Sequence, residues 1–209
     1  MKAYRLAFVF WAMASSASAS FSGCTKQERE IIDDATSAAK GLAIFAAAAV
    51  GDTEIYERWF GSYSKTNAET VRRNLKSIAT AIRSGEVSYQ CDPLGTGACE
   101  VGTYAFVYDD TPYHVHLCQR FFRQPVMASL RPGSQFSDNG SRAGTIIHEV
   151  SHFRVVASTE DHCYTRRDCT EFAIHSPQRA IENADSYQYF AEDIVHFADR
   201  AAQDAAARQ

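Results

Sequence analysis

The chain has 209 residues, which is enough for one domain with a substantial core or for two small ones. Its composition is 45% hydrophobic and 22% charged, which excludes a largely disordered chain and a membrane bundle. The formal net charge of -4 disfavours a nucleic-acid partner, because such a partner selects for a basic surface.

The N-terminus has the pattern of a secretory signal peptide. Lys2 and Arg5 supply positive charge, Leu6 to Ala14 is a short apolar run, and Ala17-Ser18-Ala19 is a small-residue cleavage site. The apolar run is too short to span a bilayer comfortably. We therefore predict a signal peptide over residues 1–19, a single domain over residues 20–209 and a secreted, extracellular protein without a membrane partner.

Six cysteines remain after the predicted cleavage. An even number in an exported chain indicates three disulfides, although the sequence alone leaves the connectivity open. Cys163 and Cys169 are close enough in sequence for a local bridge. A zinc site built from cysteines is disfavoured by the oxidising compartment and by the absence of a CxxC pair. The six residues are Cys24, Cys91, Cys99, Cys118, Cys163 and Cys169.

Three helices are predicted in the first part of the chain, where hydrophobic residues recur at helical spacing. Each is bounded by a capping residue or by a glycine. The first follows a capping box of Thr25 and Glu28 and runs to about Val50, the second starts at Glu54 and stops before Gly61, and the third has Asn67 as its cap and ends near Gly85.

The middle of the chain changes to loop and strand character. Tyr89 to Gly102 contains two cysteines, a proline and three glycines, and it is predicted to be a stapled loop. The runs Thr103–Tyr108 and His114–Cys118 are β-prone and are predicted to form a hairpin. His114 and His116 would share one face of their strand, where contact with substrate or solvent is favoured over a second metal site.

The C-terminal half is predicted to be mainly helical. A polar loop covers Pro132 to Arg142, and a helix follows from Ala143 to Val156. Ser176-Pro177 starts a last helical region, because serine is a good cap and proline suits the first turn. The tail from Arg200 to Gln209 is predicted to fray. No repeat, linker or second domain is evident.

The most informative segment is His148-Glu149-Val150-Ser151-His152. On a helix, His148 and His152 are one turn apart and point the same way, so together they can bind one zinc ion. Glu149 beside them could take a proton from an attacking water. The flanking apolar residues favour a buried helix over a surface helix with a chance histidine pair, since unpaired polar groups are costly to bury.

Zinc needs a third protein ligand, and the residues leave more than one candidate. Asp161, nine residues after His152, is the best placed, although it could instead be an ordinary turn residue. Glu160 and His162 are the nearest rivals. A more distant ligand such as Glu182 or Asp185 would give a gluzincin type of arrangement.

The segments around these residues resemble the aspzincins, the group of deuterolysin and peptidyl-Lys metalloendopeptidase. The family pattern is HExxH followed by a GTxDxxYG segment, and the resemblance extends over nearly the whole mature chain, closer to the peptidyl-Lys branch. It rests on Gly23-Cys24 before an Ala-rich helix, Trp59-Phe60-Gly61-Ser62-Tyr63, Gly102-Thr103-Tyr104-Ala105-Phe106-Val107-Tyr108, Ala143 to Phe153, Thr159-Glu160-Asp161-His162-Cys163-Tyr164 and Asn183-Ala184-Asp185-Ser186-Tyr187.

The resemblance implies an α+β, zincin-like metalloprotease fold, mostly helical with a small antiparallel sheet. The HExxH would lie on a central active-site helix. One zinc ion per chain would be bound by His148, His152 and Asp161, and Glu149 would be the general base.

Two further roles and a disulfide pairing are implied in the same way. Tyr164 matches the tyrosine that contacts substrate and helps to stabilise the oxyanion, and Asp185 matches the acidic residue of the pocket that receives a lysine ammonium group. The family pairing implies the bridges Cys24–Cys91 and Cys99–Cys118, which leaves Cys163–Cys169 as an extra bridge.

The chain departs from the family pattern at three positions. Ser158 and Thr165 stand where the family has glycine, and the local Cys163–Cys169 bridge could reshape the second turn. Gln188 stands where lysine-specific members have a second acidic pocket residue, so that a lysine would be held by Asp185, aided by the dipoles of Gln188 and Tyr164.

Together, these features predict a secreted zinc metalloendopeptidase, a monomer that acts on proteins or peptides and prefers lysine at P1′. One alternative is a broad-specificity neutral protease of the deuterolysin type. Another is a secreted binding protein or toxin on a zincin scaffold, which the presence of all four chemical residues disfavours.

Overall fold

The computed structural model of the chain describes residues 19–108, 110–131 and 138–206, with side chains up to residue 197. All but the last residue of the predicted signal peptide therefore lies outside the described residues, as does part of the predicted loop from Pro132 to Arg142. In chain order the elements are β1 (Phe21–Ser22), α1 (Lys26–Ala49), α2 (Glu54–Phe60), α3 (Lys65–Ser84), β2 (Ser88–Asp92), β3 (Ala105–Val107), β4 (His114–Cys118), η1 (Phe121–Arg123), η2 (Met127–Ser129), α4 (Arg142–His152), α5 (Arg166–His175), α6 (Pro177–Ala180) and α7 (Ala184–Ala206).

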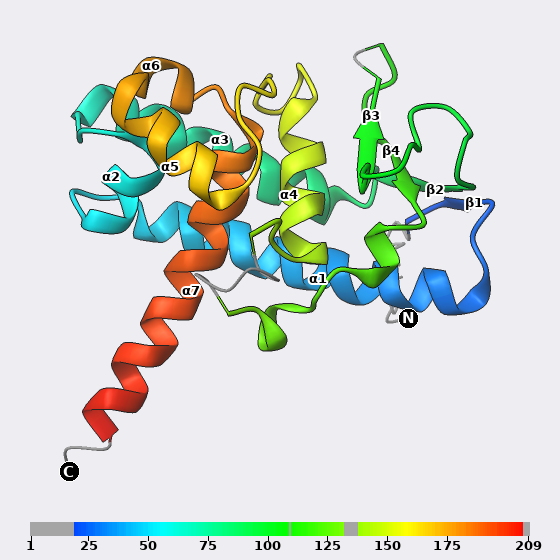
Figure 1. Ribbon diagram of the computed structural model, residues 1–209, viewed down its shortest axis with the longest axis horizontal. Coiled ribbons are helices and arrows are strands. Elements are labelled where there is room, and N and C mark those ends of the chain that lie inside the picture. Colours follow the sequence, from blue (N-terminus) through cyan, green and yellow to red (C-terminus); the bar gives the residue numbers. More distant parts are fainter. Residues whose placement is uncertain (1–18, 109, 132–137, 207–209) are drawn as a thin grey trace, which may run out of the picture.

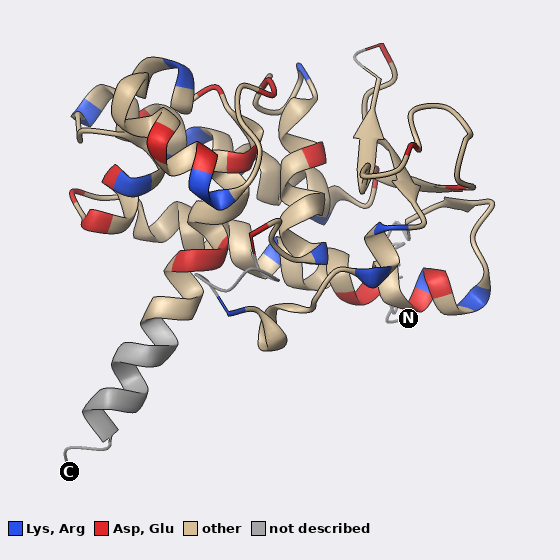
Figure 2. Cartoon of the chain, in the orientation of Figure 1, with Lys and Arg blue, Asp and Glu red and all other residues tan. Residues whose placement is uncertain are grey.

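The fold is mostly helical with one small sheet, as predicted. Figure 1 shows the sheet at one end of the molecule and α2, α5 and α6 at the other, with α4 between them and α1 running below from the sheet end toward α2. Acidic and basic residues are interspersed over the helices at the α2 end (Figure 2). Among the described helices, none is sufficiently long and apolar to cross a membrane.

The predicted N-terminal helices are confirmed, with one correction at a cap. Thr25 and Glu28 form the expected capping box at the start of α1. Helix α3 begins earlier than predicted, because the N-cap is Ser64, whose hydroxyl accepts the backbone N–H of Asn67 at 3.2 Å. Asn67 itself lies inside the helix, and Gly85 ends it in the left-handed conformation.

The sheet is mixed, which corrects the prediction of an antiparallel sheet. Its order is β1-β2-β4-β3, and only the β3–β4 hairpin is antiparallel. Strands β1, β2 and β4 run parallel. The three N-terminal helices form the connection that returns the chain from β1 to β2 in the same direction. The prediction of a loop over Tyr89 to Gly102 was wrong at its start, because Ser88–Asp92 forms strand β2.

The three disulfides are those that were expected. Cys24–Cys91 joins the start of α1 to β2, and Cys99–Cys118 joins the loop before β3 to β4. Cys163–Cys169 closes a short loop before and within α5. No cysteine among the described residues is left free for a metal.

Helix α4 ends at His152 rather than at Val156, and this early end shapes the loop that follows. Phe153 leaves the helical region, and its carbonyl accepts the backbone N–H groups of Val156, Ala157 and Ser158. Ser158 has a positive φ of 53° and turns the chain back toward α4.

The C-terminal helices differ from the prediction in number and length. Helix α5 was not predicted. The predicted last helical region begins at Pro177 as expected but is divided into the short α6 and the long α7. The backbone of α7 stays helical to Ala206, so the tail predicted from Arg200 is helical over that length.

Helices α4 and α7 pack closely because two glycines leave room for α7 side chains. A Cβ atom added to Gly144 would lie 2.0 Å from Glu192 Oε1 and 2.8 Å from Gln188 Cγ. One added to Gly140 would lie 1.9 Å from Gln188 Nε2. The close approach brings the HEVSH segment of α4 against the N-terminal part of α7.

Gly144→Ala should therefore destabilise the fold by about 1–3 kcal/mol, because the new methyl group overpacks the α4–α7 contact. Thermal unfolding should show a melting temperature lower by several degrees. The control is Gly41→Ala in α1, where no atom lies within 4 Å of the added Cβ. That variant should be equally or more stable, since alanine favours a helix. Equal melting temperatures for both variants would contradict the close packing.

Candidate active site

The HEVSH segment forms the last part of α4, which is almost completely buried. His148, Glu149 and Ser151 are buried there, and the ring of His152 is partly buried. Helix α4 starts at the N-cap Ser141, whose hydroxyl accepts the N–H of Gly144 at 3.1 Å. The two histidine rings lie one turn apart with their centroids separated by 4.7 Å.

Both imidazoles are oriented by acceptors at Nδ1. Nδ1 of His148 lies 2.7 Å from Asp185 Oδ1, and Nδ1 of His152 lies 2.9 Å from the carbonyl oxygen of Thr159. An acceptor at Nδ1 favours the tautomer with the proton on that atom, which leaves the lone pair on Nε2. The two Nε2 atoms face each other at 3.1 Å.

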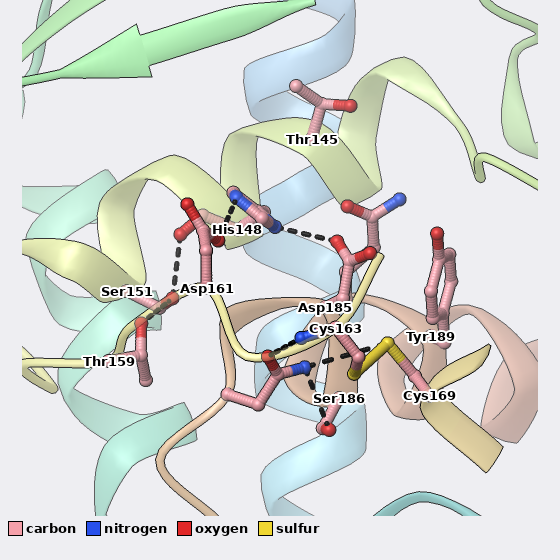
Figure 3. A network of polar contacts seen from close by, with 12 residues as sticks. Thr145, His148, Ser151, Thr159, Asp161, Cys163, Cys169, Asp185, Ser186 and Tyr189 are labelled. Atoms are coloured by element: carbon pink, nitrogen blue, oxygen red, sulfur yellow. Dashed lines mark hydrogen bonds and ion pairs between the residues drawn. A yellow bond between two sulfur atoms is a disulfide. The ribbon is translucent and has the colours of Figure 1, made fainter. Parts of the chain in front are cut away.

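Asp161 completes this group, whereas the rival third ligands lie elsewhere. Asp161 Oδ1 is 3.2 Å from His148 Nε2, and Figure 3 shows this contact. The same oxygen is 3.4 Å from His152 Nε2. The Glu160 carboxylate is largely exposed and lies 3.6 Å from His162. Glu182 is exposed, and Asp185 contacts the opposite nitrogen of His148. His148, His152 and Asp161 are the only group in the described part of the chain that could hold a metal ion.

The loop that carries Asp161 is held by Asn183, a buried residue that sequence reasoning did not single out as functional. Its side-chain oxygen accepts the backbone N–H groups of His162 at 2.8 Å and Cys163 at 3.1 Å. The backbone of Glu160 pairs with the 182–184 segment in a short parallel bridge. In the sequence, the Asn183-Ala184-Asp185 segment was singled out only by its resemblance to the aspzincins. Nothing in its residues indicated these backbone contacts.

Charge in the site is distributed so that the histidines face anions. Burial opposes protonation of His148, but hydrogen bonds with Asp161 and Asp185 outweigh it and raise the pKa of the imidazole well above its usual value. Burial also works against ionisation of Asp161, yet its hydrogen bonds with His148 and His152 lower its pKa. Burial raises the pKa of Glu149 despite the two neighbouring imidazoles. The site therefore favours a bound positive charge.

The remaining predicted residues line one cleft of about 820 Å³ together with His148, His152 and Asp161. Tyr164 lies on the loop after Asp161 and is 58% exposed. Desolvation and the nearby Asp161 raise the pKa of its hydroxyl to about 12. Asp185 and Gln188 come from the first turns of α7 and are buried. Strand β3 forms the facing wall.

His114 and His116 have structural partners outside this cleft. His114 Nδ1 lies 2.8 Å from the Ser88 hydroxyl, and His116 Nδ1 lies 2.7 Å from the buried carboxylate of Asp92. The His116 ring also stacks on Phe106. These contacts give both histidines a role in joining β2, β3 and β4.

Comparison with known proteins relates this arrangement to one family. A family model described as lysine-specific metallo-endopeptidase, of the aspzincin type, matches residues 45–192. An extracellular protease of Aeromonas hydrophila is 37% identical over 185 residues, covering 86% of this chain and 49% of that protein. A peptidyl-Lys metalloendopeptidase of Pleurotus ostreatus is 34% identical over 179 residues, covering 84% of this chain and 97% of that one.

Among solved structures, a zinc peptidase from Grifola frondosa has the same fold. The TM-score is 0.69 at 28% sequence identity, and the match covers 81% of this chain and 97% of that one. This chain thus spans about half the length of the Aeromonas relative and nearly all of the Pleurotus relative. The family match over most of the chain, together with these relatives, shows that the chain belongs to the aspzincin family of metalloendopeptidases.

Proposed function

We propose that this chain is a zinc metalloendopeptidase in which His148, His152 and Asp161 hold the zinc ion. The observation that carries the proposal is the spacing of three ligand atoms, which lie 3.1 to 3.4 Å from one another. A tetrahedral ion with bonds of about 2.0 Å holds its ligand atoms about 3.3 Å apart. Two imidazole nitrogens and one carboxylate also suit zinc, and three protein ligands leave a fourth position for water.

The surrounding residues supply the other parts of peptide hydrolysis. Bound zinc would contribute Lewis-acid chemistry, polarising the scissile carbonyl and lowering the pKa of a water molecule. Glu149 takes the proton of the attacking water and delivers it to the leaving amine, a role favoured by its raised pKa. Tyr164 keeps its hydroxyl proton, because its pKa is about 12, and it donates a hydrogen bond to the developing oxyanion.

The cleft suits an extended peptide. Strand β3 is the last strand of the sheet and also lines the cleft. An extended substrate can therefore add to the sheet as a further strand, with main-chain hydrogen bonds that do not depend on its sequence. The protein would act on proteins or peptides as a monomer, without a nucleic-acid or membrane partner.

We attribute the preference for lysine at P1′ to the carboxylate of Asp185. Two features of the pocket weaken this preference. Asp185 already interacts with His148 through Oδ1 and with the Tyr189 hydroxyl, so a lysine ammonium group would share this carboxylate with both. Gln188 adds a dipole in place of a second negative charge, with its Nε2 3.5 Å from the Asn139 carbonyl. Selectivity should accordingly lie between a strict lysine-specific protease and a broad neutral protease.

Secretion forms part of the same proposal. Three disulfides are typical of proteins that fold in an oxidising compartment. One of the relatives described above is an extracellular protease. The predicted signal peptide over residues 1–19 would direct this export.

Glu149→Gln should retain one zinc ion per chain and reduce peptide cleavage by about 10²–10⁴-fold, because the amide cannot accept the proton of the attacking water. Metal analysis and cleavage of a denatured protein measure the two effects. Glu160→Gln is the matched control, since the Glu160 carboxylate is largely exposed and points to His162. Cleavage at the wild-type rate by Glu149→Gln would contradict the role of Glu149 as the general base. A binding protein on the same scaffold would then be the better assignment.

The cleavage profile of a denatured protein should show cuts concentrated before lysine. Gln188→Glu should increase kcat/KM for lysine-containing sites by about tenfold over other sites, because it adds a charged partner for the ammonium group. Mass spectrometry of the digest gives both profiles. Gln27→Glu, an exposed residue of α1, makes the same charge change away from the cleft and should alter nothing. Cuts scattered over residue types in both proteins would instead favour the deuterolysin type of specificity.

A further inference from the structure

The side chain of Tyr164 is largely exposed at the cleft, and its hydroxyl interacts with Asp161 of the same loop. The residue is 58% exposed, whereas its neighbours Cys163 and Arg166 are buried. A hydroxyl that must meet a developing oxyanion needs a defined position, since a misplacement of about 1 Å can cost a hundredfold in rate. Because so much of the side chain is exposed, the position of the hydroxyl depends on the backbone of the turn at Tyr164.

This turn has a backbone conformation that L residues rarely adopt. Thr165 has a φ of 67° and a ψ of 152°, which is unusual for a β-branched residue. Such a conformation persists only where the surroundings hold it in place. On one side lies the Cys163–Cys169 disulfide, and the Thr165 hydroxyl accepts the N–H of Asp168 at 3.3 Å.

Arg166 holds this turn through both its backbone and its side chain. Its backbone N–H donates to the Asp138 carbonyl at 3.0 Å. Its buried guanidinium forms ion pairs with Glu192 through Nη2 and with Asp193 through Nη1. The same guanidinium lies over the rings of Trp59 and Tyr189, at 5.6 and 4.7 Å from their centroids.

The two carboxylates connect Arg166 to other parts of the site. Glu192 Oε1 accepts the backbone N–H and the hydroxyl of Ser141, the N-cap of α4, both at 2.7 Å. Asp193 Oδ2 accepts the Trp59 indole N–H at 3.0 Å. The guanidinium thus joins the turn after Tyr164 to the helix that carries Asp185 and, through Ser141, to the start of α4.

We propose that Arg166 is a positioning residue for Tyr164. The two ion pairs of its guanidinium, with Glu192 and Asp193, fix the Tyr164–Thr165 turn on α7. The tyrosine hydroxyl and the substrate pocket then keep one relative position. This inference rests on the role of Tyr164 in the proposed function. It adds a contribution to the reaction from a side chain that does not line the cleft.

A double-mutant cycle with Arg166→Lys and Tyr164→Phe tests the proposal. Lysine keeps the positive charge, but its ammonium group lacks the planar guanidinium geometry that allows arginine to pair with both carboxylates. Arg166→Lys should lower kcat about tenfold with a nearly unchanged KM, and zinc content should stay at one per chain. In the Tyr164→Phe background the same change should lower kcat by less than about twofold, because the hydroxyl that it positions is already gone.

Arg167→Lys is the matched control, because Arg167 is the next residue and its side chain is 83% exposed. It should leave kcat unchanged. Equal losses from Arg166→Lys in the wild-type and Tyr164→Phe backgrounds would overturn the positioning role alone. An unchanged kcat for Tyr164→Phe by itself would overturn the role of Tyr164 in the proposed function, and the role of Arg166 with it.

Asp193→Asn gives the same test if Arg166→Lys melts without cooperativity or loses zinc. This variant keeps Arg166 and removes one of the two carboxylates that its guanidinium pairs with, at a residue outside the cleft. It should lower kcat in the presence of Tyr164 and have little effect in the Tyr164→Phe background. Equal effects in both backgrounds would contradict the proposal.

Discussion

The position of His148 between two carboxylates is the constraint on which the rest of the site depends. Asp185 contacts Nδ1 from α7, and Asp161 contacts Nε2 from the loop after α4. The two contacts can exist together only if α4 lies tightly against α7 and if the loop folds back over the end of α4. The glycines at 140 and 144, the early end of α4 at His152 and the buried Asn183 each meet one of these requirements.

Buried charge is used in the same region for two different purposes. Around His148 and His152 the carboxylates create an environment that favours a cation, and the Nε2 atoms of the two imidazoles face each other. About two turns further along α7 than Asp185, Glu192 and Asp193 pair with Arg166, and Asp193 also lies 3.5 Å from Arg58. Ser141 and Trp59 donate hydrogen bonds to the same two carboxylates. A buried charge is tolerated only when it is paired and hydrogen-bonded, so this second cluster fixes the helices that carry the first.

Local patterns in the sequence predicted those parts of the structure that depend on local interactions. The capping box of α1, strand β4 and the HEVSH helix follow from residue spacing, and the disulfide pairing follows from resemblance. Strand β2 was missed because it has five residues and leads into a segment rich in glycine and cysteine, and its pairing with β1 and β4 involves residues distant in sequence. The end of α4, the contact of Asp185 with His148 and the pairing of Arg166 with α7 depend on residues distant in sequence, which periodicity cannot reveal.

The central claim is that His148, His152 and Asp161 hold one zinc ion that peptide hydrolysis requires. The most direct test returns zinc in steps to chelator-stripped protein while cleavage of a denatured protein is measured. The account predicts no cleavage without metal, a rise that levels off at one zinc ion per chain, and no rise over that range for Asp161→Asn. Full cleavage by the metal-free protein, or a wild-type zinc titration for Asp161→Asn, would contradict it.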